Sequence, residues 1–306
     1  MSVALDVDPG IDDALAIMLA LRSPEVRLEL ITTVAGNGPL EMTTRNALRL
    51  LHHLGAPHIP VCAGAERPLS APCHGALGYH GADALGNLDI RDGPERIGRT
   101  PAHEALYEFA AAAPGERTLV ATGPLTNIAR AFQSHNDMPR LLKELVIMGG
   151  AFRLTPYGTG NETPYAEFNI WQDPEAAEIV FGSDARMLVA GLDITADPST
   201  ALDVTDVTLL RRSNSFFGTL AASLAGFTLA RHDVCQLHDP LALAIALRPE
   251  LFDFVPGEVR VHTGEGEHRG MTEFRRGEHD RLVHVACGVD AASFKHLFMQ
   301  RMAEDT

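Results

Sequence analysis

Four aspartates lie close together near the N-terminus, in the segment Asp6-Val7-Asp8-Pro9-Gly10-Ile11-Asp12-Asp13. Carboxylates this close repel one another unless something pairs with them. An aspartate at a helix N-terminus is commonplace, because it accepts hydrogen bonds from free N–H groups and meets the positive end of the helix dipole. A helix cap of this kind explains Asp12. It does not explain Asp8, which stands before Pro9 and beside apolar sequence. Asp8 and Asp13 flank a tight turn and can supply the oxygen ligands that Ca²⁺ or Mg²⁺ requires. The segment therefore predicts a divalent-metal site in a hydrolase.

The elements that position this segment follow from hydrophobic patterning. Short apolar runs alternate with helical patterns along the chain, which is typical of an α/β fold with a mostly parallel, Rossmann-like sheet covered by helices on both faces. The predicted strands are 3–7, 28–35, 59–62, 118–121, 145–148, 187–192, 259–262 and 282–285. The predicted helices are 11–21, 40–54, 102–113, 125–133, 174–181, 206–230 with an interruption near 213–215, 241–247 and 291–302. With no repeat and no convincing linker, we expect a single domain over residues 1–306.

Polar residues follow several of these strands. Ligands of open parallel sheets bind beyond the carboxyl ends of the strands. Five residues stand at or just beyond such ends, namely Asp8, Asn37, Thr122, Met148 and Asp193. We therefore expect positions far apart in the sequence to converge on one rim of the sheet.

Two further segments carry polar groups that could join this rim. His238-Asp239 directly precedes the predicted helix 241–247. Taken alone, this pair would be interpreted as a helix N-cap beside a histidine of no particular role. Glu167 and Asn169 stand two residues apart, on one side of what we expect to be an extended stretch, and taken alone they would be an ordinary polar loop edge. Asp173-Pro174 has the pattern of a helix start, and we expect it to be structural.

These segments together resemble one family, the inosine-uridine preferring nucleoside hydrolases, which cleave the N-glycosidic bond of ribonucleosides. The resemblance covers residues 3 to about 248, in the family's order and spacing. The matching segments are the N-terminal aspartate turn continued to Ala14, Val34-Ala35-Gly36-Asn37, Gly123-Pro124-Leu125-Thr126-Asn127, Met148-Gly149-Gly150, Glu167-Phe168-Asn169-Ile170 and His238-Asp239.

The resemblance implies a role for each matching residue. It implies Ca²⁺ bound by Asp8, Asp13, the backbone carbonyl of Thr122, and Asp239. It also implies a second set of residues that contact the substrate. The polar members bind the ribose, and the histidine lies beside the nucleobase. The set consists of Asp12, Asn37, His80, Met148, Glu167, Phe168 and Asn169. His238 matches a second histidine near the base and is the better candidate for assisting base departure.

The chemistry of N-glycosidic cleavage suits these residue types. Breaking the bond builds positive charge on the sugar, which a carboxylate-rich pocket stabilises. Ca²⁺ lowers the pKa of a bound water less than zinc does, so we expect Asp8 to act as the base that activates water. An imidazole such as His238 can donate to the departing base near neutral pH. We expect ribose to be preferred over 2′-deoxyribose by roughly 10⁴, because polar groups built for the 2′-hydroxyl are otherwise left unpaired.

Two segments depart from the family pattern, and both are expected to be lid-like loops. The stretch 66–98 is long and irregular and matches only around His80, and such loops in compact domains usually bind ligands or cover sites. The stretch 227–238 has no tyrosine, where some members carry one near the base. The nucleobase preference therefore stays open between purine, pyrimidine and modified bases.

Composition sets limits on partners and location. With 25 basic against 40 acidic residues, the net charge of −15 disfavours nucleic acid and anionic membranes as partners. The cysteines, Cys62, Cys73, Cys235 and Cys287, are scattered and form no Cys-x-x-Cys pair, which disfavours a disulfide framework and makes zinc unattractive. No signal peptide or membrane span is apparent, so we expect a cytoplasmic protein. The family resemblance points to a dimer or tetramer serving purine and pyrimidine salvage.

Two other functions fit part of the pattern. An Asp-x-Asp phosphatase could be suggested by Asp6-Val7-Asp8, but that chemistry usually wants a hydroxyl residue next, where Pro9-Gly10 stands, and an obvious downstream lysine is missing. A non-catalytic protein that binds Ca²⁺ and a ribonucleoside would keep the pocket. Such a binder has no need of both Asp8 and His238, which favours the enzyme.

Overall fold

The computed structural model describes residues 1–70, 77–93, 97–277 and 283–304. Within these residues, nine strands form one sheet in the order β3-β2-β1-β4-β5-β6-β9-β7-β8. From β3 to β9 the neighbouring strands are parallel, whereas β7 runs antiparallel to both β9 and β8. The strands are β1 Ser2–Val7, β2 Arg27–Thr33, β3 Val61–Ala63, β4 Arg117–Ala121, β5 Glu144–Met148, β6 Met187–Ala190, β7 Phe252–Val261, β8 Thr272–Arg276 and β9 Val283–Val289. The expected mostly parallel α/β sheet is confirmed.

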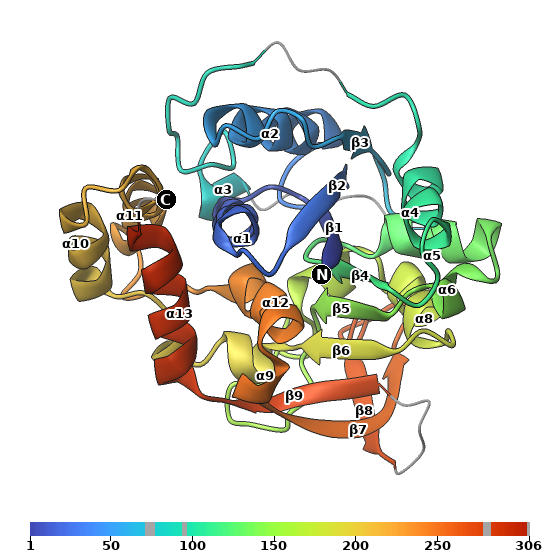
Figure 1. Cartoon of the computed structure of the whole chain (residues 1–306). Helices are drawn as coiled ribbons and strands as arrows, with labels where there is room; N and C mark the ends of the chain where they lie inside the picture. The colour runs from blue at the N-terminus through green and yellow to red at the C-terminus, as the bar shows by residue number, and fades with distance from the viewer. Residues whose placement is uncertain (71–76, 94–96, 278–282, 305–306) are drawn as a thin grey trace.

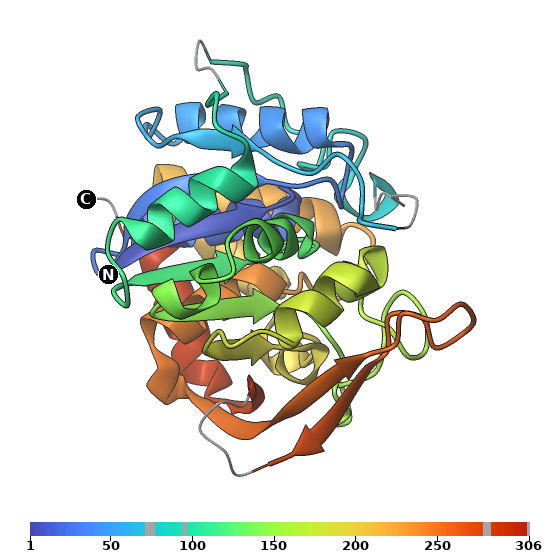
Figure 2. The ribbon, with the colours of Figure 1, turned by 90° about the vertical axis from the view of Figure 1, so that its right-hand side faces the viewer.

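Helices cover both faces of the sheet (Figure 1). One hydrophobic core joins the strands to α1, α11, α12 and α13, and a second core joins them to α4, α5, α6 and α8. Figure 2 looks from the side of the second layer, whose green helices lie in front of the strands, with the red helix α13 behind them. The helices are α1 Ile11–Arg22, α2 Leu40–His53, α3 Leu77–His80, α4 Ala102–Ala111, α5 Thr126–Ser134, α6 Met138–Leu141, α7 Phe168–Gln172, α8 Pro174–Phe181, α9 Leu192–Thr195, α10 Val204–Arg212, α11 Phe216–Leu229, α12 His238–Leu247 and α13 Ala291–Ala303, with 3₁₀ turns at Pro198–Thr200 and Pro249–Leu251.

The central strands are buried on both faces, which explains their continuous apolar runs. In β1 every residue after Ser2 is buried, and Leu5 lies in register between Ile31 of β2 and Val120 of β4. Parallel strands in register end at the same edge. The segments that follow β1, β2, β4 and β5 therefore meet there, as the strand-end rule predicts.

Several boundaries differ from the sequence predictions. The predicted strand 259–262 is the end of the longer β7, and its partner β8 was not predicted because its alternation of exposed and buried residues is weak. The predicted strand 187–192 ends at Ala190, because Gly191 caps the short helix α9. Residue 282 of the predicted strand 282–285 lies outside the described residues, and β9 begins at Val283.

Helix boundaries also moved. The predicted helix 206–230 is two helices, because the Ser215 hydroxyl accepts a hydrogen bond from Gly218 N and starts α11 anew. Phe216–Leu229 therefore reaches into the stretch 227–238 that was expected to be loop. Helix α12 begins at His238, three residues before the predicted start.

The chain shows neither disulfides nor membrane spans where it is described. Cys62, Cys235 and Cys287 are free thiols, and Cys73 lies outside the described residues. Among the helices of the described residues, none is long and apolar enough to cross a membrane.

A buried asparagine ties together the strand ends beneath the rim. Asn127, at the start of α5, donates from Nδ2 to the Asp6 carboxylate at 2.8 Å and to the Thr33 carbonyl at 3.0 Å. Its Oδ1 accepts from Ala65 N at 2.8 Å. The Asp6 carboxylate also accepts from the Thr32 hydroxyl, at 2.5 Å. Burial raises the pKa of Asp6 to about 7.

We predict that Asn127→Ala lowers the free energy of unfolding by about 2–4 kcal/mol, because it removes three buried hydrogen bonds and leaves the Ala65 N–H without its acceptor. Urea denaturation followed by circular dichroism measures the change. The matched control is Asn136→Ala, in an exposed turn, which should change stability by less than about 0.5 kcal/mol. Equal stability of the two variants would contradict the structural role of Asn127.

Candidate active site

The aspartate turn is held by its own backbone and by a neighbouring strand end. The Asp13 carboxylate accepts from Gly10 N at 2.9 Å, from Asp8 N at 3.3 Å and from the Thr122 hydroxyl at 2.9 Å. Asp13 is the third residue of α1, so it forms the carboxylate half of a capping box there. The helix start and the end of β4 therefore fix the same carboxylate.

Asp8 is fully buried, and only one of its two carboxylate oxygens has a hydrogen-bond partner among the described residues. Its Oδ2 accepts from Asn37 N at 2.6 Å, whereas its Oδ1 is buried with no hydrogen-bond partner among the described residues. Two glycines press their backbones against it. A Cβ at Gly36 would lie 2.1 Å from Asp8 Oδ2, and one at Gly123 would lie 2.7 Å from Asp8 Oδ1. Only glycine permits this close approach.

Three carboxylates come together around this turn. Oxygen atoms of Asp12, Asp13 and Asp239 all lie within 4.8 Å of one another, which makes a cluster that could hold a metal ion. Burial, followed by the charges of neighbouring aspartates, raises the pKa of Asp239 and of Asp8 well above the usual range, and the pKa of Asp13 to about 6. The group of three contains Asp12, which the resemblance assigns to ribose, in place of Asp8. Asp12 also has a buried oxygen, Oδ1, without a partner.

Glu167 and Asn169 lie beside the cluster, but not on an extended stretch as expected. Glu167 caps helix α7, and its carboxylate accepts from Asn169 N, Ile170 N and Gly150 N at 2.9, 3.0 and 3.0 Å. Asn169 Nδ2 donates to the Thr122 carbonyl at 2.8 Å and to the Met148 carbonyl at 3.3 Å. The expectation of an extended stretch was wrong, because the Glu167 carboxylate accepts hydrogen bonds from the first backbone N–H groups of α7 and so stabilises the start of a helix there.

Two histidines face the same region. His80 Nδ1 accepts from Ile11 N at 3.2 Å, and burial lowers the pKa of His80 to about 4. His238 Nδ1 lies 2.9 Å from the Thr195 hydroxyl, and burial lowers the pKa of His238 as well, although the charge of Asp12 opposes the shift. Burial therefore favours the neutral form of both imidazoles.

One cavity of about 490 Å³ brings these groups together. Its lining contains most of the predicted site residues, namely Asp12, Asn37, His80, Thr122, Met148, Glu167, Phe168, Asn169, His238 and Asp239. Asp8 and Asp13 do not line it and are fully buried. Sequence reasoning missed the remaining lining residues, which are Tyr79, Tyr157, Thr159, Gly160, Asn161, Glu162, Leu192, Ala196 and Gln236. The segment 157–162 could have been found, since it follows the carboxyl end of β5.

Asp193 is the rim residue that turns away from the cavity. Its carboxylate accepts from Phe152 N at 2.8 Å, Leu154 N at 2.6 Å and Thr155 N at 3.2 Å. It lies in α9 and not at a strand end as expected. Asp193 therefore shapes the loop after β5.

Asp173 is structural, as predicted. Its carboxylate caps α8 by accepting a hydrogen bond from Ala176 N, and it also accepts from Leu69 N and from the Thr126 hydroxyl.

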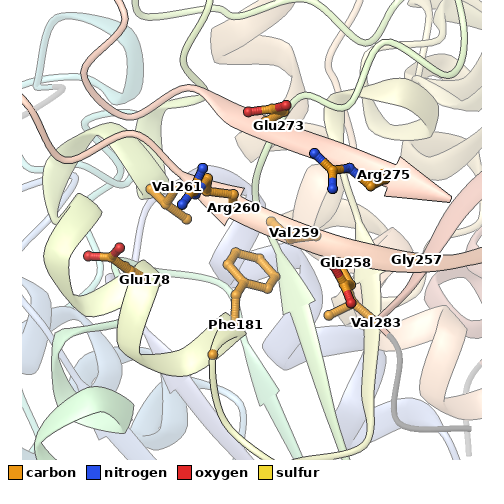
Figure 3. Close-up of a pocket in the computed structure, with 11 residues that line it drawn as sticks. Glu178, Phe181, Gly257, Glu258, Val259, Arg260, Val261, Glu273, Arg275 and Val283 are labelled. Atoms are coloured by element: carbon orange, nitrogen blue, oxygen red, sulfur yellow. The ribbon is translucent and has the colours of Figure 1, made fainter. Parts of the chain in front are cut away.

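A second cavity of about 510 Å³ lies elsewhere, between α8 and the β7–β8 pair. In Figure 3 the Phe181 ring lies beside Val259, with the charged side chains of Arg260 and Glu178 around it. Its charges are mixed, and no buried polar atom without a partner belongs to its lining residues. The cavity with orphaned carboxylate oxygens beside it is therefore the better candidate site.

Comparison with known proteins agrees with this geometry. A family model described as inosine-uridine preferring nucleoside hydrolase matches residues 3–296. The pyrimidine-specific ribonucleoside hydrolase of Citrobacter koseri is 38% identical over 314 residues, covering 99% of this chain and 98% of that protein. A plant nucleoside hydrolase structure matches with a TM-score of 0.93 at 35% identity, covering 99% of both chains. A purine-preferring ribonucleoside hydrolase from Gardnerella vaginalis matches with a TM-score of 0.91 at 32% identity, covering 99% of this chain and 98% of that one.

Matches of this length, to sequence and fold alike, make the chain an enzyme of the nucleoside hydrolase class. It belongs to the inosine-uridine preferring nucleoside hydrolase family. The resemblance seen in the sequence is confirmed, and with it the hydrolysis of ribonucleoside N-glycosidic bonds as the family's reaction.

We predict that Gly36→Ala weakens divalent-cation affinity at least about tenfold, because the added methyl displaces the Asp8 carboxylate. Titration calorimetry with Ca²⁺ and Mg²⁺ measures the change, and circular dichroism checks folding. Gly264→Ala is the matched control, since a Cβ there meets nothing within 4 Å. Unchanged affinity in a folded Gly36→Ala protein would show that the position of Asp8 does not matter for the cation.

Proposed function

We propose that the protein hydrolyses ribonucleosides to ribose and free base with Ca²⁺ as cofactor. The observation that supports this most is that Asp12, Asp239 and the histidines His80 and His238 line one cavity. Such a cavity can stabilise positive charge on a sugar while it offers a hydrogen bond to a departing base.

The donor set fits a hard cation. In the described chain, the cluster contains carboxylates without cysteine or histidine, which favours Ca²⁺ or Mg²⁺ over zinc. The unpartnered Oδ1 of Asp8 is an oxygen that desolvation leaves in need of positive charge. Asp8, Asp13, the Thr122 carbonyl and Asp239 would hold the ion. When bound, Ca²⁺ supplies charge neutralisation and Lewis-acid polarisation at this site.

The protein's own groups would then divide the chemistry. Asp8 would take a proton from the attacking water through its unpartnered Oδ1. Attack on the sugar carbon from the face opposite the base is a single displacement, as in inverting glycosidases. Asp12, Asn37, Glu167 and Asn169 grip the ribose, with Met148 and Phe168 packed beside it.

His238 would act at the base. When its Nδ1 accepts from the Thr195 hydroxyl, the Nε2–H is left to donate to the departing base. His80 would flank the base from helix α3. Its Nδ1 is occupied by Ile11 N, so its Nε2–H also points away from the turn as a donor.

Besides the residue roles proposed above, other expectations from the sequence stay predictions. They are the single domain, the lid-like role of 66–98 and 227–238, the dimeric or tetrameric state, the cytoplasmic location and a role in purine and pyrimidine salvage.

We predict that the purified protein releases ribose from uridine or inosine in the presence of Ca²⁺, measured by a reducing-sugar assay. Asp8→Ala should lower turnover by about 10³-fold or more and weaken Ca²⁺ binding in calorimetry, because it removes both the base and an ion ligand. Asp137→Ala, which removes an exposed aspartate, is the control. No ribose from any nucleoside at high enzyme concentration would leave a binding protein as the function. Unchanged Ca²⁺ affinity in Asp8→Ala would remove Asp8 from the metal site.

We predict that His238→Ala slows uridine hydrolysis by about 10²–10⁴-fold, but slows p-nitrophenyl riboside by about tenfold or less, because p-nitrophenolate departs without a proton. Steady-state kcat/KM values on both substrates give the comparison. His58→Ala, at an exposed position, should match the wild type. An equal loss on both substrates would take His238 out of the leaving-group role.

A further inference from the structure

Gln236 has a carboxamide in the wall of the active-site cavity, with an acceptor that nothing satisfies. Its Oε1 is buried and has no hydrogen-bond partner among the described residues. Its Nε2 makes one long contact, 3.5 Å from the Ala196 carbonyl. A buried carbonyl oxygen without a partner is unfavourable, so its presence beside a ligand cavity calls for a donor from the ligand.

The backbone on both sides of Gln236 is fixed. Cys235 and Leu202 exchange two backbone hydrogen bonds of 2.9 Å each. The Leu237 carbonyl accepts from Leu241 N at 3.1 Å, in the first turn of α12. The carboxamide is therefore presented from a rigid position, which a selective hydrogen bond requires.

The neighbours of Gln236 place it near the nucleobase. It stands two residues before His238, the proposed donor to the departing base, and both side chains line the same cavity. Leu192, Ala196 and Tyr79 also line the cavity and offer mainly apolar surface, whereas the ribose-type polar groups come from other elements. A flat base packed on apolar groups leaves its polar edge as the part that a carboxamide can read.

We propose that Gln236 is a specificity-determining residue that reads the lactam edge of the nucleobase, and this rests on the proposed hydrolase function. Its Oε1 accepts from a ring N–H, and the second Nε2 hydrogen donates to the adjacent ring carbonyl. Uracil and hypoxanthine present this donor and acceptor side by side. Cytosine presents an unprotonated ring nitrogen at the same place, so the fixed carboxamide meets acceptor against acceptor.

The orientation of the amide follows from its anchor. Reversing the carboxamide would bring Oε1 against the Ala196 carbonyl and lose the contact that Nε2 makes there. A site with a fixed hydrogen-bonding group rejects a ligand that leaves the group unpaired.

The test compares kcat/KM for uridine, 3-methyluridine, cytidine and p-nitrophenyl riboside in the wild type and in Gln236→Met, which keeps the size of the side chain but lacks the amide. In the wild type we expect uridine to exceed both 3-methyluridine and cytidine by about tenfold to hundredfold. In Gln236→Met both ratios should fall to about threefold or less, with p-nitrophenyl riboside within about twofold of the wild type, because that substrate has no lactam.

Two further variants sharpen the result. Gln236→Glu keeps the acceptor and removes the donor, so it should keep a preference for uridine over 3-methyluridine. Gln300→Met makes the same change on helix α13, outside the cavity, and should leave every ratio as in the wild type.

Retention of both wild-type ratios in Gln236→Met, or their absence in the wild type, would overturn the role of Gln236. Equal losses on uridine and p-nitrophenyl riboside in Gln236→Met would do the same, because they would indicate a structural effect. Failure of the wild type to cleave any riboside would overturn the hydrolase function itself. Turnover of p-nitrophenyl riboside by the wild type separates that failure from failure of the Gln236 inference.

Discussion

The active site depends on the burial of like charges at one edge of the sheet. Asp8, Asp13 and Asp239 are all buried, and the pKa of each is raised by desolvation and by the charges of neighbouring aspartates. A fold accepts this only where the backbone fixes the acids firmly and something positive can join them. Here the backbone at the start of α1 and the Thr122 hydroxyl after β4 hold Asp13, and the close contacts of Gly36 and Gly123 hold Asp8.

Much of this arrangement could be predicted from the sequence, because parallel strands end at one edge. Asp8, Asn37 and Thr122 follow strands that lie next to one another in the sheet, so their convergence needs only the strand order. The family resemblance supplied the expected metal-binding role of Asp239, for which the sequence pattern alone would have favoured a helix cap. The burial of Asp8 behind the cavity wall could not be predicted, because it depends on how closely Gly36 and Gly123 pack.

The missed features depend on hydrogen bonds between segments distant in sequence. Glu167 was placed on an extended stretch, since nothing local shows that its carboxylate would satisfy three backbone N–H groups and start α7. Asp193 has the same position relative to a strand as the true rim residues, but its carboxylate serves the loop at 152–155. Gln236 carries no motif, and only the cavity reveals its unsatisfied oxygen.

The hydrogen bond from Ile11 N to His80 has a mechanical consequence. Ile11 opens helix α1 at the aspartate turn, whereas His80 ends helix α3 and lines the cavity. Withdrawing α3 leaves a buried backbone N–H without an acceptor, which costs about 1–3 kcal/mol. The hydrogen bond therefore couples the position of α3 in the cavity wall to the start of α1, so a displacement of α3 also changes the hydrogen bonding of the aspartate turn.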